Sequence, residues 1–129
     1  MLKKSITYKD YDNVERTEDF YFNLTEAEIT EMELSESGGL KATIERVVAE
    51  QDSKMIIELF KRILLQAYGK KSEDGRRFIK SDQLREEFSQ TMAYNKLFME
   101  LAVDADAASA FLIGVIPDNL REPFPNVSV

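Results

Sequence analysis

A wide apolar stripe between residues 52 and 68 constrains the fold of this chain most strongly. Its members recur at helical spacing, and they are Met55, Ile56, Leu59, Phe60, Ile63, Leu64 and Ala67. Asp52 precedes the stripe as a suitable N-cap, and Gly69 stands where a C-terminal glycine would end the helix. Because so wide a face must be covered, we predict that this helix is the core of the fold.

A capping box predicts another helix, which begins after Thr25. The Thr25 hydroxyl can accept the amide of Glu28, and the Glu28 carboxylate can accept the amide of Thr25. Leu24 and Ile29 flank this cap in the positions of a hydrophobic staple. We expect the helix to run to about Glu36, because Gly38 and Gly39 stop it.

Three further caps predict short helices in the second half of the chain. Ser81, Thr91 and Asp104 each precede an apolar pattern of helical spacing, and Pro117 ends the last helix. The residues expected to face inward are Leu84, Phe88, Tyr94, Leu97, Phe98, Leu101, Ala108, Phe111, Leu112 and Val115. A helix is also expected between residues 40 and 48, from the spacing of Leu40, Ile44, Val47 and Val48.

The first 23 residues favour a β-hairpin. Strand-prone residues flank a plausible turn at residues 11–13, and they are Ile6, Tyr8, Val14, Phe20, Tyr21 and Phe22. An isolated two-stranded hairpin is marginal in water, so it must pack on the helices, pair with another strand or join a partner. Phe78 and Ile79 can form a short extended piece.

These patterns predict a mainly α fold with a small N-terminal β element, that is, a compact multi-helix α+β protein. The expected organisation is a hairpin-like segment at 1–23, a helical domain at 24–117 and a flexible tail at 118–129, which contains two prolines. A length of 129 residues suits one domain with a small appendage.

Composition excludes several classes of function. The chain has no cysteine and no histidine, so disulfides, thiol nucleophiles, cysteine–histidine zinc sites and imidazole catalysis are excluded. Its net charge of -7 opposes binding to nucleic acid. No apolar run reaches the length of a membrane span, and no signal peptide is expected. A carboxylate-based enzyme remains possible on composition alone, but the chain has no complete phosphate or metal motif, so we predict a protein without enzymatic activity, cofactor or metal.

One basic cluster stands out on this acidic chain. Lys70, Lys71, Arg76, Arg77 and Lys80 lie within a single connection. They are candidates for contact with an acidic patch on a partner or on another copy of the chain. The alternative is a solvated loop whose lysines complement the negative end of the preceding helix dipole.

Three consecutive aromatic residues form the second candidate surface. Because successive strand residues face opposite sides, Phe20 and Phe22 can enter the core while Tyr21 faces out, or the reverse. The exposed ring is covered either by the chain's own helices or by a neighbouring molecule, and the sequence leaves both open.

Other motifs are incomplete. The run Gly69-Lys70-Lys71-Ser72 lacks the upstream glycine of a phosphate-binding loop, since Leu64 occupies that position. Asp104 and Asp106 resemble the start of a calcium loop, but the later glycine and glutamate are missing. The several glutamate pairs are typical of the solvated faces of helices.

Several segments together resemble a known family. These are the opening segment from Ile6 to Thr25, the helix containing Ile56 and Phe60, the run from Tyr68 to Ser81, the run from Phe88 to Leu101, and the end from Phe111 to Pro117. In these patterns of apolar and capping residues, the chain resembles the tail assembly chaperones of long-tailed phages and prophages of Gram-positive bacteria.

The resemblance implies an assembly factor that acts in the host bacterial cytoplasm. Such a protein binds the tape measure protein, helps recruit tail tube subunits and self-associates; a longer frameshifted product is common in the family. Two other classes stay open: a structural tail or head-completion component retained in the virion, and a small regulatory or antitoxin-like binding protein. A carboxylate-dependent enzyme is a more distant alternative.

Overall fold

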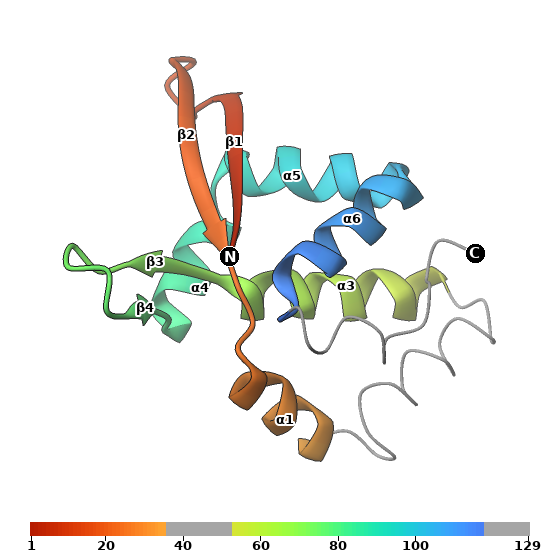
Figure 1. Ribbon diagram of the computed structural model, residues 1–129. Coiled ribbons are helices and arrows are strands. Elements are labelled where there is room, and N and C mark those ends of the chain that lie inside the picture. The colour runs from red at the N-terminus through yellow and green to blue at the C-terminus, as the bar shows by residue number, and fades with distance from the viewer. Residues whose placement is uncertain (36–52, 118–129) are drawn as a thin grey trace.

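The computed structural model of the protein describes residues 1–35 and 53–117, and Figure 1 shows how its elements are arranged. In chain order these are β1 (Leu2–Lys9), β2 (Glu15–Phe22), α1 (Glu26–Ser35), α3 (Ser53–Ala67), β3 (Tyr68–Lys71), β4 (Phe78–Ile79), α4 (Asp82–Ser89), α5 (Met92–Val103) and α6 (Ala105–Val115). The helix expected at 40–48, the cap at Asp52 and the tail at 118–129 lie outside the described residues.

Strands β1 and β2 form a long antiparallel hairpin, paired from Leu2 with Phe22 to Lys9 with Glu15. The turn predicted at residues 11–13 is confirmed, and Asn13 takes a positive φ of 63° there. Asparagine tolerates this left-handed conformation better than most residues. The turn end of the hairpin projects beyond the helices in Figure 1, whereas β1 lies beside α5.

The expectation of a mainly helical fold with a small β element is wrong. The four strands of the described residues form one antiparallel sheet in the order β1-β2-β3-β4. The first helical stripe ends at Ala67, and the next residues pair with the hairpin, Tyr68 with Phe22 and Gly69 with Tyr21. The amide of Asn23 also donates to the carbonyl of Ala67 at 2.8 Å. The helix therefore ends close to the expected position, and a paired strand follows it directly.

Gly69 therefore serves close packing rather than termination of a helix. A Cβ at this position would lie 2.7 Å from Cε2 of Phe78 and 2.9 Å from the carbonyl oxygen of Ile79. These distances are too short for a side chain, so glycine lets β4 approach β3. Lys70 and Lys71 come shortly after the end of α3, as the sequence had suggested, but they belong to strand β3.

The caps predicted from sequence are confirmed within the described residues. Thr25 and Glu28 exchange hydrogen bonds of 2.9 and 3.1 Å, as a capping box requires. The side chains of Ser81, Thr91 and Asp104 accept amides in the first turns of α4, α5 and α6 at 3.0–3.1 Å. These local contacts fix where four helices begin.

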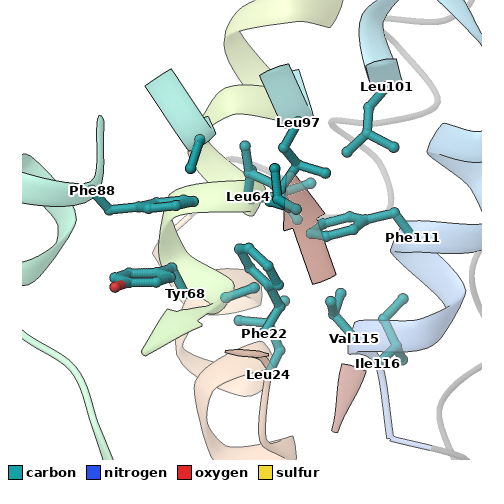
Figure 2. Close-up of a cluster of buried hydrophobic side chains, with 14 of the residues drawn as sticks. Phe22, Leu24, Leu64, Tyr68, Phe88, Leu97, Leu101, Phe111, Val115 and Ile116 are labelled. Atoms are coloured by element: carbon teal, nitrogen blue, oxygen red, sulfur yellow. The ribbon is translucent and has the colours of Figure 1, made fainter. Parts of the chain in front are cut away.

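The core lies where the sheet meets the helices. Its four largest fully buried side chains come from β2, α3, α5 and α6, and they are Phe22, Leu64, Leu97 and Val115. Figure 2 shows these residues converging, with Phe111 beside Phe22 at a ring-centroid distance of 5.2 Å. Burial of each such side chain stabilises the fold by about 1.5–3 kcal/mol.

The prediction that helix α3 is the core of the fold holds only for the C-terminal half of its stripe. Ile63, Leu64 and Ala67 are buried, whereas Leu59 and Phe60 are only half-buried against the core. The core is therefore shared among several elements and is not centred on one helix.

Candidate protein-interaction surface

Four of the predicted basic residues lie on one projecting arm, formed by β3, β4 and the turn between them. Lys70 and Lys71 are exposed on β3, and Arg76 and Arg77 are exposed in the turn. In Figure 1 this arm and the β1–β2 hairpin extend in different directions from the body of the molecule. The arm thus presents its positive charges to solvent.

Hydrogen bonds within the turn hold this arm in shape. The Ser72 amide donates to the carbonyl of Arg77 at 2.8 Å, and the Ser72 hydroxyl donates to Asp74 at 2.7 Å. Asp74 also accepts the amide of Arg76 at 3.0 Å, and these two hydrogen bonds lower the pKa of its carboxyl. Gly75 takes a φ of 74°, which suits glycine. The cations are therefore displayed on an ordered turn.

Lys80, grouped with this cluster by sequence, is separated from it by the fold. Its ammonium donates to Glu28 at 2.5 Å and to the carbonyl of Asn23 at 2.7 Å. Its side chain is 11% exposed and that of Glu28 is 30% exposed. Lys80 therefore ties the end of β4 to the capping box of α1 and does not face a partner.

The environment of this pair shifts both pKa values. Burial lowers the pKa of Lys80, although the Glu28 carboxylate opposes that shift. Burial alone would raise the pKa of Glu28, but hydrogen bonds from Lys80 and from the Thr25 amide outweigh it and lower the pKa. The sequence did not reveal this pair, because Lys80 and Glu28 are 52 positions apart. The residues next to Glu28 indicate only its role in the capping box.

The three consecutive aromatic residues divide between the two faces of β2. Phe22 is fully buried and Phe20 is half-buried, and both rings pack on Phe88, at centroid distances of 5.9 and 5.4 Å. Tyr21 lies on the opposite face, with the Lys71 ammonium 5.3 Å from its ring centroid. The first of the two arrangements left open by the sequence is therefore the one present.

A groove opens where β3 separates from β2. It has a volume of about 560 Å³ and is lined by Tyr8, Glu18, Asp19, Phe20, Tyr21, Tyr68, Gly69, Lys70, Lys71, Leu84, Glu87, Phe88 and Thr91. Tyr68 and Phe88 stack in parallel at 4.1 Å between centroids, and with Phe20 they form an aromatic floor. The groove brings the predicted residues Phe20, Tyr21, Lys70 and Lys71 together, but it does not include Arg76 or Arg77.

The described residues offer no arrangement typical of a metal site. Among residues 1–35 and 53–117, no group of three or more acidic side chains could hold a metal ion. Asp104 acts as the N-cap of α6, and the segment containing Gly69 leads into a strand turn and not into a helix. In the same part of the chain, no helix has the length and apolar character needed to cross a bilayer.

The described helices and the four-stranded sheet define a small α+β protein. The comparison with known families identifies it further: residues 1–126 match the phage tail assembly chaperone family, so the chain belongs to that family. Searches of curated proteins and of solved structures gave no match. The family resemblance inferred from the sequence is thereby confirmed.

Proposed function

We propose that this protein is a non-enzymatic chaperone that binds the tape measure protein and helps recruit tail tube subunits in the host bacterial cytoplasm. The family match over residues 1–126 is the observation that carries the proposal. Two ordered, solvent-exposed projections, the β1–β2 hairpin and the β3–β4 arm, are consistent with it, because a chaperone must contact a client through its surface.

Self-association is the second part of the proposal. The arm residues Lys70, Lys71, Arg76 and Arg77 are exposed, while the whole chain carries a net charge of -7. An acidic surface on a second copy would complement this arm, and such contacts weaken as salt rises. Repeated contacts of this kind would let several copies cover a long client.

Coexpression with the tape measure protein of the same phage tests the proposal. The expected result is a soluble complex recovered by pull-down through a tag on this chain, with the client insoluble when expressed alone. If the client stays equally insoluble and no complex is recovered, the chaperone function is refuted.

Mass spectrometry of purified virions distinguishes the chaperone from a structural component that is retained in the virion. A chaperone leaves during assembly and would be absent, whereas a structural tail or head-completion component would be present at a stoichiometric level. Detection of this chain at that level, together with a failed pull-down, would favour the structural role.

A further inference from the structure

Strand β2 has one edge that the described sheet covers only in part. Along one side it pairs with β1 over its whole length, from Glu15 to Phe22. Along the other side, β3 pairs only with Tyr21 and Phe22. Among the described strands, none pairs with residues 15–20 on that side. An unpaired edge of this length is a template for an added strand.

The backbone groups at this edge point toward the open side at alternate residues. The Asn23 amide bonds to Ala67, on the side of β3. Since successive residues of an antiparallel strand alternate in direction, Thr17 and Asp19 also turn their amides and carbonyls to that side. All residues from Glu15 to Asp19 are exposed. The edge thus offers a regular set of donors and acceptors.

The opposite edge of the hairpin differs, because helix α5 covers it. The Lys96 ammonium donates to the carbonyl of Thr7 on β1, and Lys4 forms an ion pair with Glu100 at 3.7 Å. The chain therefore covers the β1 edge with a helix and leaves the β2 edge open among the described elements.

The open edge borders the groove with the aromatic floor. Glu18 and Asp19 belong to both, and Phe20, the next residue of β2, packs on Phe88 in the floor of the groove. A strand paired with residues 15–19 would direct alternate side chains toward this floor and the others to the outer face. An apolar residue suits the floor, and the added backbone would fill the space where β3 departs from β2.

The charges of the edge favour a particular kind of occupant. On the outer face, Glu15 and Asp19 flank Thr17, and both are exposed. Antiparallel pairing with a second copy of this edge, centred on Thr17, would set Glu15 opposite Asp19 of the other copy, which is unfavourable. A strand with basic residues at these positions would instead be stabilised.

From this arrangement we propose that the β2 edge, residues 15–19, binds an extended segment of the client in which apolar residues alternate with basic ones. The segment adds a strand beside β2, places an apolar side chain on the floor formed by Phe20, Tyr68 and Phe88, and directs basic side chains toward Glu15 and Asp19. This inference rests on the proposed function, because it names the surface that receives the client.

Substitution of Thr17 tests the pairing directly. Thr17→Pro removes an amide at the open edge and obstructs an added strand, while the pairing of β2 with β1 is retained, since the lost amide points away from β1. Thr17→Val is the matched control: it lacks the hydroxyl that contacts Thr7 at 2.8 Å but keeps the amide. In pull-downs with the tape measure protein, Thr17→Pro should bind at least about tenfold more weakly, and Thr17→Val about as well as the unmodified chain.

Two further measurements complete the test. In the complex of the unmodified chain, the Thr17 and Asp19 amides should exchange hydrogen more slowly than in the free chain. This measurement needs no variant. The double variant Glu15→Lys, Asp19→Lys should weaken client binding, more at low salt than at high salt.

The outcomes separate the inference from the proposed function. If the unmodified chain forms the complex and Thr17→Pro binds equally well without new protection at the edge, the inference is overturned and the function stands. If Thr17→Pro breaks self-association but its monomer still binds the client, a second copy occupies the edge and the inference is again overturned. If the unmodified chain forms no complex, both are refuted.

Discussion

The two ends of strand β2 serve opposite purposes. At its inner end, Phe22 is fully buried and contacts aromatic rings from three other elements, those of Tyr68, Phe88 and Phe111. At its outer end, residues 15–19 are all exposed and mostly charged. One strand therefore anchors the fold at one end, and at the other end one of its edges has no pairing partner among the described strands.

This difference shows how a small protein can expose a strand without losing stability. The hairpin alone would be marginal in water, but its base is held by the core and by pairing with β3. Charged side chains at the outer end oppose uncontrolled pairing between edges. Substitutions at the two ends should accordingly affect different properties, stability at the inner end and binding at the outer end.

The largest expected effect is at the inner end. Phe22→Ala should lower the free energy of unfolding by about 3–5 kcal/mol, because it leaves a cavity among rings that cannot close around it. Urea unfolding followed by circular dichroism measures this loss. As a control from the outer end, Thr17→Ala should cost no more than about 0.5 kcal/mol. Equal losses of unfolding free energy for Phe22→Ala and Thr17→Ala would show that the two ends of β2 contribute equally to stability.

The next largest effect compares two positions of α3 and tests which part of this helix belongs to the core. Leu64→Ala should cost about 2–5 kcal/mol because Leu64 is fully buried. Leu59→Ala, one turn and a residue earlier, should cost less, since Leu59 is only half-buried. Thermal and urea unfolding of both variants gives the two values. If Leu59→Ala lost more unfolding free energy than Leu64→Ala, the core would have to lie nearer the start of α3 than the structure places it.

A smaller effect concerns the pair that joins α1 to the end of β4. Glu28→Gln keeps the capping geometry but removes the charge that faces Lys80, and it should cost about 1–3 kcal/mol at neutral pH. Because the folded pKa of Glu28 is lowered from 4.5, its stabilising contribution is present above that value and is lost as pH falls through the folded pKa.

Urea unfolding from pH 7 to pH 3 tests this linkage. The difference in stability between the unmodified chain and Glu28→Gln should shrink toward acid pH. A difference that stays constant over this range would mean that the Glu28 carboxylate does not interact preferentially in its charged form.

The smallest effect on stability is expected on the arm. Reversing the charges of Lys70, Lys71, Arg76 and Arg77 to glutamate should change the free energy of unfolding by less than about 1 kcal/mol, since all four are exposed. It should nevertheless weaken self-association, more at low salt than at high salt. Analytical ultracentrifugation at two salt concentrations measures this. An unchanged sedimentation profile at low salt would show that the arm does not take part in self-association.

Local patterns in the sequence were sufficient for the helix starts and for the turn of the hairpin. The caps at Thr25, Ser81, Thr91 and Asp104 depend on contacts within a few residues, which a sequence displays directly. The family resemblance followed from similar patterns along most of the chain. The division into segments ending at residues 23 and 117 stays a prediction.

What the sequence by itself determined about this protein is therefore its local structure, its acidic character and its family. Only the tertiary structure decided that Tyr68 and Gly69 form a strand directly after the end of α3, because their pairing partners, residues 21 and 22, are distant in the sequence. It also separated Lys80 from the other cations by pairing it with Glu28. Both results depend on contacts between residues more than 40 positions apart, whose energy no local pattern records.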